Sequence, residues 1–132
     1  LKGYVSVIIA HKYFNELVYL SALICLIGHI FPVWLKFKGG KGVATYLGII
    51  LGISFMLGVV FVVVWLLTAI IFRYSSLSSI LSSMVVCVYS FLSSNEMQSY
   101  FLFAIFVIII FTHKKNIMRL KNSKEDKIRL NS

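Results

Sequence analysis

The sequence has little charge, and acidic residues are especially scarce. Only 13% of its 132 residues are charged, and four of them are Asp or Glu. A soluble domain typically carries charge on roughly a quarter of its residues, whereas 60% of this chain is hydrophobic. The composition therefore excludes an ordinary soluble domain and favours a chain surrounded largely by lipid.

Cysteine is scarce as well. Cys25 and Cys87 lie in apolar segments, and neither belongs to a CxxC pair. This pattern gives no disulfide framework and no metal site. We expect both cysteines to be small core residues.

The basic residues give a net charge of +9. They are few between Lys41 and Lys114 and flank the apolar segments, a distribution that does not favour nucleic acid as the partner. Anionic lipid headgroups or a phosphorylated substrate fit this distribution better.

Segments without charged residues mark the candidate membrane spans: 17–35 (apart from His29), 42–72, 74–95 and 97–112. So few segments cannot close a barrel, and a span in lipid must satisfy its own backbone hydrogen bonds. We predict an all-α, polytopic membrane helix bundle over 1–112, followed by a basic tail over 113–132. The apolar segment 3–11 is shorter than the about 20 residues of a span, and the chain begins at Leu1, so we expect an upstream piece.

The segment 42–72 is too long for one span. As a single straight helix it would reach roughly 47 Å, against about 30 Å of hydrocarbon. Gly48, Gly52 and Gly58 interrupt it, so we predict a short helix from about Val43, a turn within 51–55, and a return helix ending near Phe72.

Sidedness agrees with this hairpin. With hairpins over 3–31, 42–72 and 74–112, all of the 13 basic residues except Lys12 fall on one side. Lys and Arg accumulate on the cytoplasmic side. We therefore expect the loop 36–45 and the tail in the cytoplasm, and the serine-rich segment 74–94 to pack closely against its neighbours.

The loop Phe-Lys-Gly-Gly-Lys-Gly-Val-Ala-Thr at 37–45 places three glycines around Lys41 at a helix start. Glycines let backbone amides approach a phosphate, the helix start adds partial positive charge, and Lys41 adds a full charge. No Ser or Thr follows the lysine directly, so this is not a nucleotide-binding Walker loop. The alternative is a flexible loop whose lysines meet lipid headgroups.

Two histidines lie close to span ends. His29, three residues before Pro32, either caps the membrane boundary or lines a site. On a continuing helix His113, Asn116 and Arg119 would share one face and could meet the same anion as Lys41. For the other basic tail residues we prefer a basic juxtamembrane helix; these are Lys114, Lys115, Lys121, Lys124, Lys127 and Arg129.

Four stretches together resemble the bacterial acyl-phosphate:glycerol-3-phosphate acyltransferase family, PlsY. They are Gly-His-Ile-Phe-Pro at 28–32, the loop 37–45, Arg-Tyr-Ser-Ser-Leu at 73–77, and the stretch 113–120 with Glu125. The pair Lys2-Gly3 is similar to the start of the family's second span. Asn122 stands where the family usually has glycine, and we expect a small effect because Asn also tolerates a left-handed turn.

The resemblance implies seven membrane helices, six of them in this chain, with the active site at the cytoplasmic face of the bacterial inner membrane. The absent part would be the first span and a Ser/Gly/Asn-rich loop ending in arginine, so the fragment would be an incomplete enzyme. The implied reaction transfers a fatty acyl group from acyl phosphate to the 1-hydroxyl of glycerol 3-phosphate, giving lysophosphatidic acid. It needs no metal and no cofactor, and we expect a monomer.

The resemblance also implies residue roles. The catalytic residues would be His113, Ser76, Asn116 and Lys41, with His113 handling or orienting the proton. The phosphate-binding residues would be Gly39, Gly40, Lys41, Gly42, Thr45 and Arg119. Candidate supporting residues are His29, Lys38 and Glu125.

Two other classes remain open from the residues alone. A small membrane anion transporter or exchanger would also use a glycine loop between broken helices, but it predicts polar residues deep within the spans, which are almost empty of them. A non-catalytic packing subunit gives no reason for Lys41, Ser76, His113 and Asn116 to gather on one side.

Overall fold

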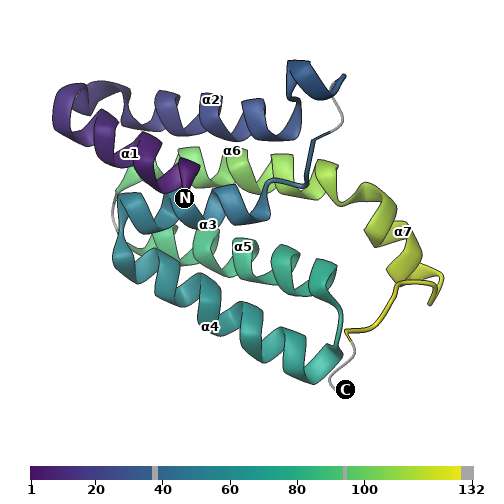
Figure 1. Ribbon diagram of the computed structural model, residues 1–132. Coiled ribbons are helices and arrows are strands. Elements are labelled where there is room, and N and C mark those ends of the chain that lie inside the picture. Colours follow the sequence, from purple (N-terminus) through teal and green to yellow (C-terminus); the bar gives the residue numbers. More distant parts are fainter. Residues whose placement is uncertain (37–38, 94, 129–132) are drawn as a thin grey trace. The chain divides into compact units, whose positions relative to one another are not determined.

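The computed structural model describes residues 1–36, 39–93 and 95–128, and every regular element in them is helical (Figure 1). The predicted all-α fold class is therefore confirmed. The chain divides into two compact units, Leu1–Val59 and Val60–Ser132, and the boundary falls inside one helix. The division predicted from charge, a bundle over 1–112 and a tail over 113–132, is of another kind and stays a prediction.

The first unit contains α1 (Lys2–Tyr13), η1 (Asn15–Leu17), α2 (Val18–Ile30), η2 (Val33–Leu35) and α3 (Val43–Ile53). Helix α1 packs against both α2 and α3 (Figure 1). The span predicted over 17–35 is wrong at its end, because the helix stops at Ile30. The physical reason is Pro32, which disfavours helical backbone at the residue before it, and Phe31 has left the helix.

The contact between α1 and α3 depends on glycine. A Cβ added to Gly3 would overlap the carbonyl oxygen of Thr45 and lie 3.2 Å from the amide nitrogen of Ile49. On the facing helix, a Cβ on Gly48 would lie 3.0 Å from the amide nitrogen of Tyr4. Gly52, four residues further on, would meet Cβ of Val7 at 2.8 Å. The two helices therefore approach closely through a small-residue face, as membrane helices commonly do.

The predicted break in 42–72 is confirmed, but the interruption assigned to Gly48 and Gly52 is wrong. Helix α3 ends at Ile53 and α4 (Phe55–Phe72) begins after Ser54, which is in extended conformation. The chain folds back there, as the close approach of α4 to α3 shows: a Cβ on Gly58 would lie only 3.5 Å from Cα of Leu51. Gly48 and Gly52 lie inside α3 as packing residues and do not interrupt it.

The second unit contains most of α4 together with α5 (Ser75–Leu92), α6 (Glu96–Thr112) and α7 (Lys114–Lys121). As predicted, the α5 serines serve packing. Several donate back to carbonyls of their own helix, as Ser82 does to Ser78 at 2.7 Å. Others join helices: the indole of Trp65 donates to Ser79 at 3.2 Å, and Ser90 and Ser99 hydroxyls lie 3.0 Å apart. Small hydroxyl residues thus satisfy their polar groups inside an apolar bundle.

Helices α4 and α5 are long and apolar enough to cross a membrane. The pair α6 and α7 gives a third candidate if the two are taken as one span, although they are bent by 61°. Among the described residues, α2 with η1 and α3 are apolar but shorter. The helices expected over 42–72, 74–95 and 97–112 are therefore present.

Candidate functional site

The glycine loop of the first unit is fixed to the end of α2. The amide of Gly39 donates to the carbonyl of Ile30 at 3.2 Å. A Cβ on Gly39 would overlap the carbonyl oxygens of both His29 and Ile30 and would lie 2.6 Å from Cδ of Pro32. Glycine is therefore required at 39 by close approach, and its amide serves the protein backbone. The predicted supporting residue Lys38 lies outside the described residues.

Gly40 lies against the ring of His29. A Cβ there would come within 2.9 Å of Nε2 of His29. His29 is near the end of α2, and its ring is partly buried. Of the two alternatives for His29, lining a site is the one that this contact favours, because the ring packs on the glycine loop itself.

The loop leads directly into α3. Gly42 is the residue before the helix and has a φ of 86°, in the left-handed region where glycine is preferred. Its carbonyl accepts the first helical hydrogen bond, from Tyr46 at 2.8 Å. Lys41, just outside this helix start, is exposed. Thr45 is buried, with its carbonyl against Gly3 of α1. An exposed cation therefore precedes the positive end of a helix.

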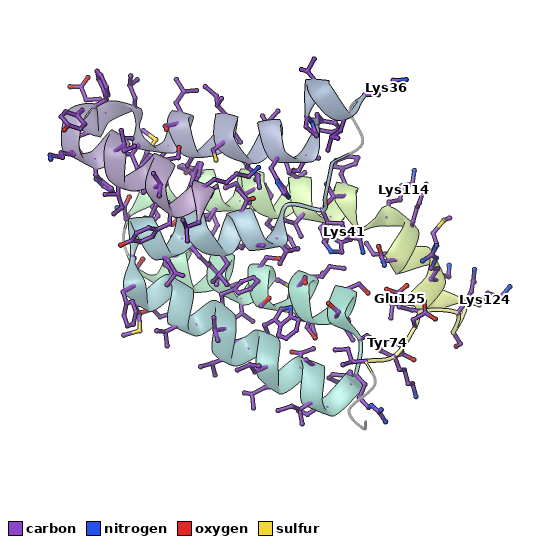
Figure 2. All side chains as sticks on the ribbon, viewed as in Figure 1. Lys36, Lys41, Tyr74, Lys114, Lys124 and Glu125 are labelled. Carbon is purple, nitrogen blue, oxygen red and sulfur yellow. The ribbon has the colours of Figure 1, made fainter. Side chains whose placement is uncertain are left out.

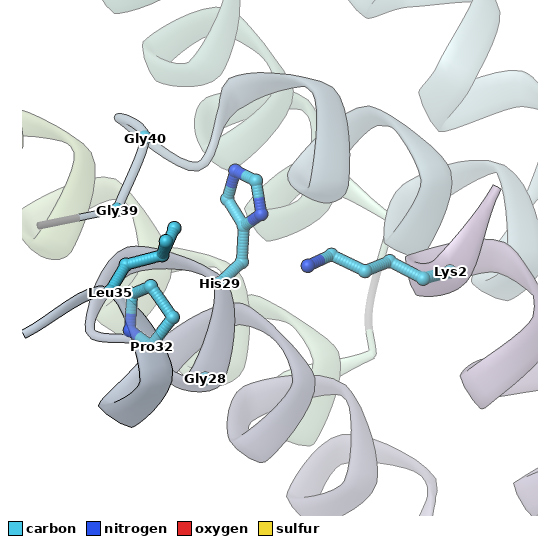
Figure 3. A pocket seen from close by; sticks show the side chains of 7 residues that line it. All are labelled: Lys2, Gly28, His29, Pro32, Leu35, Gly39 and Gly40. Atoms are coloured by element: carbon cyan, nitrogen blue, oxygen red, sulfur yellow. The ribbon is translucent and has the colours of Figure 1, made fainter. Parts of the chain in front are cut away.

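A pocket of about 180 Å³ opens beside this loop (Figure 3). In Figure 3 the Lys2 side chain extends toward the His29 ring. The pocket is lined by Lys2, Gly28, His29, Pro32, Leu35, Gly39 and Gly40. Lys2 comes from α1, so three separate segments of the first unit form this pocket.

The second unit holds another group of predicted residues, connected through Glu125. The Ser76 hydroxyl donates to Oε1 of Glu125 at 2.7 Å, and the Asn116 amide donates to the same oxygen at 2.6 Å. Ser76 and Asn116 are both buried. One carboxylate oxygen thus fixes two predicted catalytic side chains, a stronger arrangement than neutral hydrogen bonds would give.

The segment after α7 carries Glu125 and is tied to the junction between α4 and α5 (Figure 2). The amide of Ile128 donates to the carbonyl of Arg73 at 2.7 Å, and the Arg73 guanidinium donates to the carbonyl of Ile128 at 3.1 and 3.2 Å. The Lys127 ammonium lies 5.9 Å from the centre of the Tyr74 ring. These contacts place Glu125 beside Ser76. Arg73 itself has a φ of 62°, in the left-handed region that side chains rarely adopt.

His113 marks a bend between α6 and α7, so the straight continuing helix on which His113, Asn116 and Arg119 would share a face is not present. Its amide is shared between the carbonyls of Ile109 and Ile110, at 3.1 and 3.2 Å. Its Nδ1 also donates to the Ile109 carbonyl at 2.8 Å. These bonds satisfy the end of α6, and α7 continues at 61°.

The bend separates the predicted face into buried and exposed parts. His113 and Asn116 are buried, whereas Arg119 is exposed. Of the residues predicted on a basic juxtamembrane helix, Lys114, Lys115 and Lys121 lie on α7, whereas for Lys124 and Lys127 the prediction is wrong, because the helix ends at Lys121. All five are exposed. Arg129 lies outside the described residues.

The donor chemistry of the second unit is specific. Because a carbonyl oxygen only accepts, Nδ1 of His113 carries the hydrogen, and in the neutral ring the lone pair is on Nε2. The Ser76 hydroxyl and the Asn116 side-chain amide each donate a hydrogen bond to Glu125. Ser76 keeps its oxygen lone pairs for accepting. The sequence predicted hydrogen-bonding roles for these residues, but it did not predict that Glu125 accepts hydrogen bonds from Ser76 and Asn116.

Comparisons with known proteins point to one family. The glycerol-3-phosphate acyltransferase family matches residues 1–123. A glycerol-3-phosphate acyltransferase of Pelagibacter ubique (strain HTCC1062) is 44% identical over 117 residues, covering 89% of this chain and 61% of that protein. Another, from Ehrlichia canis (strain Jake), is 46% identical over 132 residues, covering 97% of this chain and 68% of that protein.

Solved structures agree with the sequence relatives. The crystal structure of PlsY (YgiH), an integral membrane glycerol 3-phosphate acyltransferase, in its glycerol 3-phosphate form is similar with a TM-score of 0.92 and 31% identity. The match covers 96% of this chain and 66% of that one. A lysophosphatidic acid form of PlsY gives a TM-score of 0.91 and 32% identity, covering 95% of this chain and 66% of that one. The chain thus spans about two thirds of the length of the relatives it matches.

Proposed function

This chain belongs to the glycerol-3-phosphate acyltransferase family, and we propose that the protein containing it transfers an acyl group from acyl phosphate to the 1-hydroxyl of glycerol 3-phosphate. The products are lysophosphatidic acid and inorganic phosphate. PlsY is known in a glycerol 3-phosphate form and in a lysophosphatidic acid form, which correspond to the proposed acceptor and product. The chain is an integral membrane protein, and we place it in the bacterial inner membrane with its basic loop and tail in the cytoplasm.

The observation that carries the proposal is the loop of the first unit. Gly39 is fixed to Ile30, and the chain then runs through Gly40, Lys41 and Gly42 into the start of α3. Backbone amides at a helix start and a neighbouring ammonium are the groups that bind phosphate. Both proposed substrates are phosphorylated, so such a loop would bind what they share. Thr45, on the first turn of α3, would add a hydrogen bond.

The second unit supplies groups suited to orienting the attacking hydroxyl. In the proposed reaction this oxygen bonds to the acyl carbon, the bond from that carbon to the phosphate oxygen breaks, and phosphate leaves. The hydroxyl proton must go to an acceptor, for which the departing phosphate is sufficient. Ser76 and Asn116, held by Glu125, would accept hydrogen bonds from the glycerol 3-phosphate hydroxyl and so orient it.

The His113 imidazole and the Arg119 guanidinium complete the proposed site. His113 would orient the hydroxyl through Nε2, since its Nδ1 is used by the Ile109 carbonyl. Arg119, exposed on α7, would be a second cation for phosphate. Positioning and electrostatic stabilisation would therefore supply most of the rate acceleration, and the apolar helix faces would hold the acyl chain.

Lys41→Ala tests the proposal. We expect acyl transfer to fall by a factor of about 100 or more, which is the scale of losing one key electrostatic group. Release of phosphate from acyl phosphate plus glycerol 3-phosphate would be measured on the purified full-length protein that contains this chain, with lysophosphatidic acid followed by mass spectrometry. Lys12→Ala is the matched control, because Lys12 is an exposed lysine at the far end of α1. Near-normal turnover of Lys41→Ala would refute the assignment.

A further inference from the structure

The pocket beside the loop contains a cation that the proposed reaction has not yet used. Lys2 lies on α1, whereas the glycines and Lys41 belong to the segment before α3. Its side chain extends into the pocket toward His29 (Figure 3). The ammonium and the glycine loop therefore line one cavity within the first unit.

Within the first unit, the charge of Lys2 has no acidic counterpart near this pocket. Glu16 is the one acidic residue in the sequence of the first unit. It lies in η1, beyond the other end of α1. At 1.5 Å per residue, that end of the helix is roughly 18 Å away. In the described part of this unit, no carboxylate thus lies beside the Lys2 ammonium, and an anion could bind to it.

The opposite wall of the pocket is formed by the glycine loop and the His29 ring. The Gly39 amide donates to the Ile30 carbonyl, and Gly40 lies against the His29 ring, which brings a polar group to this wall. A neutral imidazole offers one N–H donor and one acceptor nitrogen, which suits a ligand with both phosphate and hydroxyl groups. The cavity, at about 180 Å³, is below the roughly 300–1,000 Å³ of sites for drug-sized ligands. A small phosphorylated polyol fits this chemistry, and a long acyl chain does not.

We propose that Lys2 is a further substrate-binding residue, which contacts the phosphate monoester of glycerol 3-phosphate in the pocket between α1, the end of α2 and the glycine loop. The inference rests on the proposed function and deepens it. It assigns the pocket to the acceptor substrate and gives α1 a direct part in binding. Acyl phosphate would bind without Lys2.

Lys2→Met tests this, because methionine keeps an unbranched stem and removes the charge. We expect the KM for glycerol 3-phosphate to rise about 10-fold or more, the scale of a lost charge-assisted hydrogen bond. The kcat and the KM for acyl phosphate should change by less than about 3-fold. Lys2→Arg keeps the charge and should restore most of the affinity. Lys12→Met, the same substitution at the other end of α1, should behave as the unsubstituted protein.

Each other outcome has a definite reading. A raised KM for acyl phosphate alone, or a fall in kcat alone, would overturn the assignment to the acceptor. An effect seen in nanodiscs with anionic lipid and absent in zwitterionic ones would make Lys2 a headgroup contact and would also overturn it. If the unsubstituted full-length protein that contains this chain transfers no acyl group, the proposed function fails. Calorimetric titration with glycerol 3-phosphate then still tests the pocket: binding lost in Lys2→Met supports the inference, and equal binding refutes it.

Discussion

Gly39→Ala should displace the glycine loop proposed to bind phosphate, without altering any charged or polar side chain. The added methyl group would overlap the carbonyl oxygens of His29 and Ile30 and lie 2.6 Å from Cδ of Pro32. These are backbone atoms and a ring fixed to the backbone, so no flexible side chain can move aside. The loop itself must shift, and the 3.2 Å bond from the Gly39 amide to the Ile30 carbonyl is then strained or lost.

The size of the effect follows from the cost of overpacking. An extra methyl group in a tight site typically costs about 1–3 kcal/mol. If that cost falls on phosphate binding, at about 1.4 kcal/mol per tenfold, the KM for glycerol 3-phosphate should rise roughly 5- to 140-fold. Initial rates of phosphate release over a range of glycerol 3-phosphate, at saturating acyl phosphate, would measure it.

Gly28→Ala is the matched control. Gly28 lines the same pocket, but a Cβ there has nothing within 4 Å. The KM should stay within about twofold, and the helix should gain roughly 0.5–1 kcal/mol because alanine is a better helix former than glycine. An unchanged KM in Gly39→Ala would refute the reasoning, as would equal damage from the two substitutions.

Two further substitutions test the contacts on which the two units depend. Glu125→Gln keeps a carbonyl oxygen for Ser76 and Asn116 but removes the charge, which should weaken each bond by about 1 kcal/mol and lower kcat roughly tenfold in single-turnover measurements; a normal rate would show that the charge is dispensable. Gly3→Ala would force α1 away from the Thr45 carbonyl and should cost about 1–3 kcal/mol, seen as a lower midpoint of thermal unfolding in detergent. An unchanged midpoint would contradict the close approach of α1 and α3.

The break within 42–72 shows that a helix break can be predicted from the length of an uncharged segment. The length of the uncharged segment against the thickness of the bilayer predicts that one straight span does not fit, and the structure has the break at Ser54. The glycines were misread, because Gly48 and Gly52 fit both a broken helix and a packed one. Their spacing of four residues puts them on one helix face, which is the pattern of close helix packing. Only the partner helix α1 decides between the two interpretations.

The site of the second unit could be predicted as a set of residues but not as a network. Ser76 and Glu125 are 49 positions apart in the sequence, and the contact between them depends on the hydrogen bonds joining Arg73 to Ile128. Neither periodicity nor composition carries information about such a pairing. The bend at His113 escaped prediction for a related reason, since a histidine that bonds to its own helix carbonyl looks in the sequence like any polar residue at a span end.

The distribution of acidic residues agrees with the different roles proposed for the two groups of predicted residues. The first unit has one acidic residue in its sequence, Glu16, which lies in η1 beyond the far end of α1 from Lys2; this arrangement suits the binding of phosphate by Lys2. In the second unit Glu125 accepts hydrogen bonds from Ser76 and Asn116. A carboxylate close to a phosphate-binding lysine would compete with the substrate for it, whereas a carboxylate that orients two acceptor groups helps a hydroxyl present its lone pair to a carbonyl carbon. We therefore expect changes in the first unit to appear mainly in KM, and changes at Glu125 and its two partners mainly in kcat.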